Sequence, residues 1–271
     1  MSYDKVRQYY SVFDEWSRLS SPEGMLEFTL LHRIIDKTIK IGSKVLDLGG
    51  GPGRHTIELA KKGYTMTLGD LSPDLVKTAK EKAKGVPNIE SIDVVNSVDM
   101  KIYKDASFDA VLCFGPLYHI IDDADIDRTL SEVYRVLKPG GEILAIYIPY
   151  LTGVSGIIER SMYDPAQVDA AVLDEVYRKG IFHNKTDSGF QEGRFLKASE
   201  VNTIMSKAGF LKTQIRSVRG FGYKLEKGII QKESEDKEMY NKIIQIIEES
   251  AALSELADTN GHALYIGKKP E

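Results

Sequence analysis

The sequence predicts an α/β protein built on a mostly parallel β-sheet with helices on both faces. Two observations predict this class. From Lys44 onward, short apolar runs alternate with amphipathic stretches of helical length, and the first run leads directly into a glycine-rich turn. Strands that alternate with helices of this length form parallel sheets, because each helix returns the chain to the edge from which the previous strand started.

Each expected element follows from a local pattern. The expected strands are the apolar runs at 44–48, 64–70, 89–95, 108–114, 142–148, 210–218 and 262–268. Helices with one apolar face are expected at 3–18, 22–40, 54–62, 72–84, 123–137, 199–208 and 233–255. The second of these begins at Ser21-Pro22-Glu23, which supplies a cap, a first-turn proline and an acid.

The alternation breaks between residues 149 and 195. This stretch holds scattered Gly, Tyr and charged residues, with one helical pattern at about 165–179. Because sheet elements are expected on both sides of it, we interpret it as an insertion within one domain. The predicted single domain, residues 1–271, therefore has N-terminal helices (1–40), a core (41–148), the insertion (149–195) and a C-terminal part (196–271).

Composition narrows the class of protein. Apolar residues make up 42% of the chain and charged residues 28%, which is typical of a folded globular protein. The formal net charge of −4 offers no basic field for a nucleic-acid backbone. The single cysteine, Cys113, excludes an internal disulfide and a cysteine-cluster metal site, and we expect no metal. The sequence has no run of membrane-spanning length and no apolar signal-peptide core, so a cytoplasmic protein without a membrane partner is expected.

The most informative stretch is "KVLDLGGGPGRHTIELA", residues 44–60. A glycine-rich turn between a strand and a helix lets backbone N–H groups approach a ligand, although a tight structural turn is the alternative. A dinucleotide site requires G-x-G-x-x-G, and counting from Gly49 puts Arg54 at the third glycine position. The spacing here is instead an acid followed by alternating glycines, Asp47-x-Gly49-x-Gly51-x-Gly53, and no phosphate-loop Lys-Ser/Thr pair follows.

This pattern resembles the first motif of the class I S-adenosylmethionine (SAM) dependent methyltransferases. Further segments match the family in the right order: "GDLSPDLVKTAKEKA", "ASFDAVLCFGPLYHI", "EVYRVLKPGGEILAI", "SKAGFLKTQIRSV" and "HALYIGKK". The resemblance implies a Rossmann-like, seven-stranded, mostly parallel sheet whose last strand is antiparallel. It also implies SAM as cofactor, S-adenosylhomocysteine as product, and glycines that make room for the amino-acid end of SAM.

The resemblance implies a set of cofactor-binding residues. Asp70, at the end of the second strand, is expected to accept hydrogen bonds from both ribose hydroxyls, and Leu71 to pack on the adenine. Asp47 would hold the loop amides or the ligand ammonium, or have a purely structural role. The full predicted set is Asp47, Gly49, Gly50, Gly51, Gly53, Asp70, Leu71, Asn96, Ser97, Val98, Phe114, Tyr10 and Trp16.

Two candidates for catalysis lie after the fourth strand. A neutral His119 imidazole is suited to take a proton from an acceptor, and Tyr118 beside it has a hydroxyl. Packing beneath the cofactor is the alternative role for both. The acidic stretch 122–127 is interpreted as the first turn of a helix, Asp109 as an organiser of its strand start, and Cys113 as inert core.

The acceptor is expected to be a small molecule methylated on O or N. The loop "GPLY" lacks the Asp/Asn-Pro-Pro-aromatic sequence of enzymes that modify exocyclic amines of bases. An RNA or tRNA methyltransferase and a non-catalytic SAM-binding regulator or partner subunit remain alternatives; a monomer or homodimer is expected. The aromatic first helix is interpreted as core packing or as a lid on the SAM pocket. The insertion is expected to cover the active site, with side chains such as Tyr150, Tyr163 and Phe182 as pocket walls.

Overall fold

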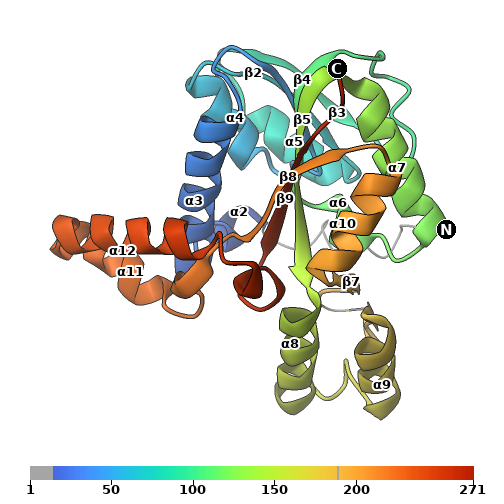
Figure 1. Cartoon of the computed structure of the whole chain (residues 1–271), viewed down its shortest axis with the longest axis vertical. Helices are drawn as coiled ribbons and strands as arrows, with labels where there is room; N and C mark the ends of the chain where they lie inside the picture. Colours follow the sequence, from blue (N-terminus) through green and yellow to red (C-terminus); the bar gives the residue numbers. More distant parts are fainter. Residues whose placement is uncertain (1–14, 188) are drawn as a thin grey trace.

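The computed structural model describes residues 15–187 and 189–271, and its centre is a sheet of nine strands (Figure 1). Five parallel strands form one side in the order β3-β2-β1-β4-β5. Their bounds are β1 Lys44–Leu48, β2 Thr65–Asp70, β3 Ile89–Val94, β4 Phe108–Cys113 and β5 Leu137–Pro149. The strand order reverses between β1 and β4, and the crevice beyond such a reversal is where open α/β sheets bind ligands.

The other side of the sheet contains the antiparallel strand that the family resemblance implies. β9 (Ala263–Lys268) pairs antiparallel with both β5 and β8 (Leu211–Ser217). Seven strands of the predicted sheet are therefore confirmed. The two further strands, β6 (Ile181–His183) and β7 (Glu192–Leu196), belong to the insertion and were not predicted. β7 pairs with the last two residues of β5.

Alternating residues of the strands pack against helices on opposite faces of the sheet. On one face Val45, Ala110 and Leu144 pack with residues of α3 (Pro22–Thr38), α4 (Arg54–Lys61) and α12 (Lys237–Ser250). On the other, Leu46, Val111 and Ile143 pack with α7 (Asp123–Val136) and α10 (Ala198–Lys207). Burial on both faces explains why these strands are continuously apolar.

Side-chain caps begin several helices where the sequence places them. The Ser21, Ser72 and Asp122 side chains accept backbone N–H groups at the starts of α3, α5 (Pro73–Lys82) and α7. A short helix, α6 (Pro116–His119), replaces the expected loop after β4. Of the predicted first helix, only α2 (Glu15–Arg18) lies within the described residues.

The strand β5 begins five residues earlier than predicted. The sequence "KPGG" reads as a turn, but Leu137 already pairs with Phe108, and the register shifts before Glu142 pairs with Ala110. Asp109 organises this edge, as predicted. Its carboxylate accepts the Lys44 amide at 2.8 Å and the Lys138 ammonium at 2.6 Å.

The insertion is more regular than expected. It forms α8 (Tyr150–Tyr163), α9 (Ala170–Lys179), β6 and β7, and α8 and α9 extend beyond the end of β5 at the bottom of Figure 1. The sequence did not predict α8, because Gly153 and Gly156 lower its helix propensity. Packing requires Gly153: a Cβ there would lie 2.1 Å from the Phe195 ring.

The C-terminal part also differs in one element. A single helix was predicted at 233–255, but the structure has α11 (Glu226–Glu235) and α12, with short 3-10 turns at Gly220–Gly222 and Ser254–Asp258. The break occurs at Asp236, whose side chain accepts the Met239 amide at 3.0 Å and caps α12. No helix within the described residues combines the length and apolar character needed to cross a membrane.

Candidate cofactor and acceptor site

A pocket opens at the carboxyl ends of β1, β2 and β4. Three connections and one short helix supply its walls: the glycine turn after β1, the turn after β2, the loop after β3, and α6. The lining residues are Leu48, Gly49, Gly51, Gly69, Asp70, Leu71, Ser72, Leu75, Val95, Asn96, Ser97, Gly115, Pro116, Tyr118, His119 and Ile120.

The glycine turn is shaped first by contacts within the protein. Gly49 has φ +75°, and a Cβ there would lie 2.8 Å from the Pro116 side chain. A Cβ on Gly50 would lie 2.8 Å from Leu68 and 2.9 Å from the Asp47 carboxyl. The expectation that the glycines leave space for a ligand therefore needs correction at these two positions, where the protein itself fills the space.

Asp70 joins the ends of two strands. One of its carboxylate oxygens accepts the amide of Gly51, and the other accepts the amide of Ser72, each at 2.8 Å. Asp70 is 8% exposed and lines the pocket. A carboxylate oxygen has lone pairs for more than one donor, so hydrogen bonds to the backbone do not by themselves prevent Asp70 from accepting ligand hydroxyls.

Asp47 lies beneath the turn and is buried. One carboxylate oxygen accepts the Thr56 hydroxyl at 2.7 Å, whereas Oδ1 has no hydrogen-bond partner within the described part of the chain. Burial raises the pKa of Asp47 to about 6; the Thr56 hydrogen bond opposes this rise and the nearby Asp70 charge adds to it. An unsatisfied buried carboxylate oxygen is the kind of atom that a bound ammonium would pair with.

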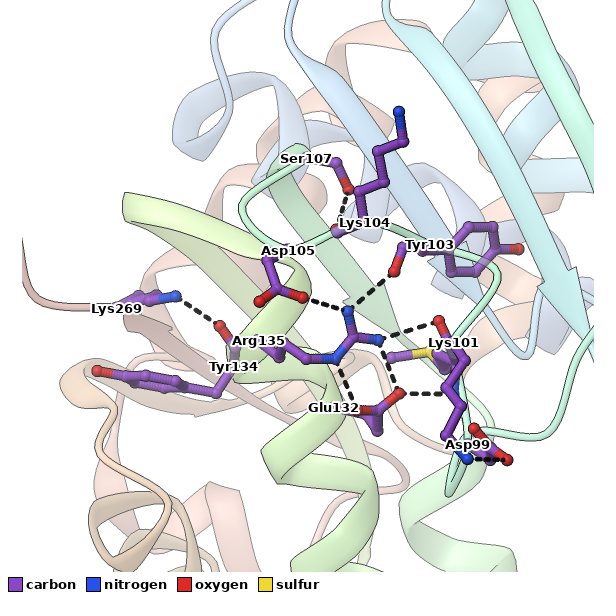
Figure 2. Close-up of polar contacts among 11 residues, drawn as sticks. Asp99, Lys101, Tyr103, Lys104, Asp105, Ser107, Glu132, Tyr134, Arg135 and Lys269 are labelled. Carbon is purple, nitrogen blue, oxygen red and sulfur yellow. Dashed lines mark hydrogen bonds and ion pairs between the residues drawn. The ribbon is translucent and has the colours of Figure 1, made fainter.

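The loop after β3 is fastened to α7. Ser97, which lines the pocket, lies with its hydroxyl 3.1 Å from that of Thr129. Further along, Arg135 donates to the carbonyl oxygens of Met100 and Tyr103 and to the carboxylates of Asp105 and Glu132 (Figure 2). Arg135 therefore holds two main-chain carbonyl groups and the Asp105 side chain of the loop that carries Asn96 and Ser97.

The pocket brings together much of the predicted residue set. It includes Gly49, Gly51, Asp70, Leu71, Asn96, Ser97, Tyr118 and His119. Among the described residues, Asp47, Gly50, Gly53, Val98, Phe114 and Trp16 do not line it. The Trp16 ring lies under the Lys82 ammonium, at the far end of α5 from Ser72. Tyr10 lies outside the described residues. Contact of each residue with the cofactor stays a prediction.

The histidine that was predicted as a base is mostly enclosed. The Nδ1 atom of His119 lies 3.4 Å from the Glu192 carbonyl oxygen, and its ring contacts Phe190. Burial lowers the pKa of His119 to about 4, which makes it a weak base near neutral pH. Phe190 and Glu192 are the residues through which the insertion contacts His119. No described residue of 149–195 lines the pocket.

The insertion side chains that were expected as pocket walls lie elsewhere. Tyr163 is 82% exposed, and Phe182 is buried inside the insertion's own apolar cluster. Tyr150 donates its hydroxyl to the Tyr177 carbonyl oxygen. The expectation that these three residues form the pocket walls was therefore wrong. The reason is that α8 and α9 extend away from the sheet and pack on each other.

Sequence reasoning missed a polar cluster beside α6. His262, just before β9, lies with Nδ1 2.8 Å from Oε1 of Glu27 in α3. Arg219 approaches the other Glu27 oxygen at 3.4 Å and pairs with Glu226 at 2.7 Å. The Tyr118 ring stacks on His262, with 5.7 Å between centroids. The position of His262 could have been inferred, because an antiparallel last strand begins at the carboxyl edge of its parallel neighbours; its pairing with Glu27 depends on tertiary packing.

A second histidine pair lies between α3 and α4. The His32 Nε2 atom is 3.2 Å from Nδ1 of His55, and the Phe28 ring packs against both imidazoles. Burial lowers the pKa of His32 to about 2, with the neighbouring His55 contributing. Both rings are therefore neutral at physiological pH, and their arrangement is that of a packed core pair.

Comparisons with known proteins agree with this fold. A family profile described as a methyltransferase domain matches residues 45–141, which contain the glycine turn, Asp70 and the loop after β3. A crystal structure of a protein from Pyrococcus horikoshii aligns over 97% of this chain and 99% of its own, with a TM-score of 0.63 and 20% identity. A SAM-dependent methyltransferase from Methanosarcina mazei aligns over 88% and 97%, with a TM-score of 0.61 and 19% identity.

Curated relatives share more sequence over shorter spans. The ubiquinone/menaquinone biosynthesis C-methyltransferase of Brucella anthropi is 29% identical over 65% of this chain and 66% of its own length. The ubiquinone biosynthesis O-methyltransferase of Xanthomonas oryzae pv. oryzae is 38% identical over 38% and 41%. The matched region thus spans less than two thirds of these relatives. Residues 45–141 are thus similar to a methyltransferase domain, and the fold over nearly the whole chain is that of the two crystal structures.

Proposed function

We propose that this chain transfers the methyl group of SAM to an O or N atom of a small-molecule acceptor. The observation that carries the proposal is the pocket at the carboxyl ends of β1, β2 and β4. It combines a glycine turn, a buried carboxylate at the end of β2 and a polar loop after β3. These residues fit SAM, because a ribose and an adenine each find a matching partner type there.

The strand order sets the direction in which the cofactor would lie. Asp70 would hold the ribose above β2, with Leu71 and the Asn96–Ser97 segment around the adenine toward β3. The methionine end then extends the opposite way, over β1 and β4. The reacting end of the pocket is consequently the α6 end, bounded by Gly115, Tyr118 and His119.

Bound SAM supplies an electrophilic methyl group on a sulfonium sulfur. The residues of this chain have to position the acceptor in line with that methyl group and exclude competing water. Enclosed aromatic side chains at the α6 end, including Tyr118 and Phe190, provide such a setting. Acceptors that carry a proton on the attacking atom also need a base.

The choice of a small molecule rests on charge and on the relatives. The chain has a net charge of −4, which disfavours RNA, and the named relatives act in ubiquinone and menaquinone biosynthesis. Because their names include both C- and O-methyltransferases, the atom methylated has to be measured. An RNA methyltransferase and a non-catalytic SAM-binding partner are the competing functions.

The test is methyl transfer from isotopically labelled SAM to a panel of phenols, hydroquinones, primary and secondary amines and bulk tRNA. Mass spectrometry and NMR of the product identify the methylated atom. Asp70→Ala serves as the control with an impaired cofactor site. Transfer to O or N of a small molecule supports the proposal. Transfer to carbon or tRNA, or tight SAM binding without any transfer, contradicts it.

A further inference from the structure

The polar cluster beside α6 contains a carboxylate–imidazole pair whose geometry fixes the tautomer. Nδ1 of His262 lies 2.8 Å from Oε1 of Glu27. A carboxylate only accepts hydrogen bonds, so Nδ1 carries the hydrogen of the neutral ring and Nε2 holds the lone pair. A carboxylate in this position also stabilises the imidazolium that forms when Nε2 takes a proton.

Glu27 is held in its charged form. Burial opposes its ionisation, but attraction to His262, Arg219 and Arg18 holds the pKa of its carboxyl at about 2. The charged and titratable groups that face the pair come from five places. They are Arg18 of α2, His55 of α4, Tyr118 and His119 of α6, Arg219 after β8, and Glu226 of α11, which pairs with Arg219.

One aromatic ring separates His262 from the pocket. The Tyr118 ring stacks nearly parallel on the His262 ring, at 15°, and Tyr118 itself lines the α6 end of the pocket. The His262 side chain is 23% exposed; it does not itself line the pocket and reaches it through the stacked Tyr118 ring. Of the five histidines in the chain, His262 therefore combines a carboxylate partner with ring stacking on a residue that lines the reacting end.

The other histidines lack this combination. His32 and His55 pair with each other in the core between α3 and α4. His119 reaches the pocket, but its Nδ1 faces a carbonyl oxygen, which offers an imidazolium less stabilisation than a carboxylate does. His183 has a carboxylate partner, Glu192 at 3.4 Å, but it lies on β6, and among the described residues no ring contact joins it to a residue that lines the pocket.

We propose that His262, oriented by Glu27, is the general base for methyl transfer. The inference rests on the proposed function and names the base of the same site. The attacking O or N forms its bond to the methyl carbon while the carbon–sulfur bond breaks with its electron pair on sulfur. The proton on the attacking atom passes to Nε2 of His262, and Glu27 remains ionised. This base is required by acceptors whose attacking atom carries a proton, namely an un-ionised hydroxyl or a neutral amine with an N–H.

The test uses the full chain and the phenol or amine that the wild type methylates in the panel above. His262→Asn should lower kcat about 10²-fold or more without changing the SAM dissociation constant. Glu27→Gln should lower kcat less and move the acidic limb of the pH–rate profile to lower pH, because it removes the charge that stabilises the imidazolium. Added imidazole should partly restore His262→Ala. His32→Gln, which changes a histidine of the core pair between α3 and α4, is the control and should keep the wild-type rate and pH profile.

The outcomes separate the two proposals. If the wild type binds SAM but methylates nothing in the panel, the proposed function fails and the base assignment falls with it. If the wild type is active and His262→Asn keeps its normal rate and pH profile, only the base assignment is overturned. Loss of the acidic limb in His119→Asn, with a normal profile in His262→Asn, would assign the base to His119 instead. Unchanged SAM affinity and circular dichroism confirm that each variant is folded.

Discussion

Asp70 accepts the backbone amide of Gly51 at 2.8 Å, so the last residue of β2 fixes the glycine turn that follows β1. The same carboxylate accepts the amide of Ser72, the cap of α5. One side chain thus connects three parts of the pocket before any ligand binds. This preorganisation lowers the conformational entropy that cofactor binding would otherwise cost.

Replacing Asp70 with Ala should weaken SAM binding by roughly 1.5–3 kcal/mol, the range for hydrogen bonds to a charged group. The loss has two sources, the ligand hydroxyls and the Gly51 amide. Isothermal calorimetry with SAM and S-adenosylhomocysteine measures it. Asp109→Asn is the control, because that carboxylate holds the opposite end of the sheet through Lys44 and Lys138. Tight NAD binding without SAM binding would contradict the cofactor assignment.

Gly49→Ala should abolish SAM binding and destabilise the fold. Its Cβ would lie 2.8 Å from Pro116, which would displace α6, and φ is +75°. Gly85→Ala is a matched control, since Gly85 has φ +78° and nothing lies within 4 Å of the added atom. Gly85→Ala should cost only the left-handed strain, about 1–2 kcal/mol. Thermal unfolding and calorimetry compare the two; equal losses in both variants would show that the contact with Pro116 is unimportant.

Arg135→Met should free the loop after β3 and lower SAM affinity about 10-fold, although Arg135 does not line the pocket. The variant removes the hydrogen bonds to Met100 and Tyr103 shown in Figure 2. Hydrogen exchange at residues 96–103 should become faster. Arg128→Met is the control, because Arg128 pairs with Asp125 of the same helix. Unchanged exchange in Arg135→Met would refute the positioning role.

The buried His32 should make the stability of the protein depend on pH. Its pKa is about 2 in the folded chain, and burial is the main cause. The unfolded chain binds this proton below about pH 6.5 and the folded chain does not, so the free energy of unfolding falls as the pH decreases through this window. His32→Gln should reduce that slope by up to about 1.4 kcal/mol per pH unit. Urea unfolding between pH 5 and 8 measures the slope. Identical slopes for the variant and the wild type would contradict the contribution assigned to His32.

The sheet and the part of the pocket around the glycine turn were predictable because local sequence patterns determine them. The strand β1, the glycine turn, Asp70 and the Ser72 cap are contiguous in sequence, and alternation of strands and helices fixes their relative positions. The resemblance to the methyltransferase family supplied the antiparallel β9.

The acceptor end was not predictable in the same way. Glu27 and His262 are 235 residues apart, and only the packing of α3 beside β9 brings them together. The helix α8 was missed because its Gly153 is selected by contact with Phe195, a tertiary requirement that overrides helix propensity. The break at Asp236 was hidden within a charged run that is compatible with one continuous helix.

The insertion approaches the reacting end of the pocket through one short segment. Phe190 contacts the His119 ring at 5.3 Å between centroids, and the Glu192 carbonyl oxygen lies 3.4 Å from His119 Nδ1. The helices α8 and α9, in contrast, pack around their own apolar cluster. Acceptor recognition by the insertion is therefore expected to depend on the 190–192 segment and on the support that α8 and α9 give to that segment.

Replacing residues 152–190 with an eight-residue Gly/Ser linker should abolish methyl transfer and leave SAM binding largely intact. Such a linker reaches roughly 26–29 Å, enough to return from β5 to β7, which run parallel. SAM binding should survive, because no described residue of the insertion lines the pocket. Phe190→Ala tests the contact with His119 alone, because α8 and α9 are still present in that variant. It should lower the rate of methyl transfer. A folded deletion variant that methylates the acceptor at the normal rate would place recognition elsewhere, with α2 and α3 as the remaining candidates.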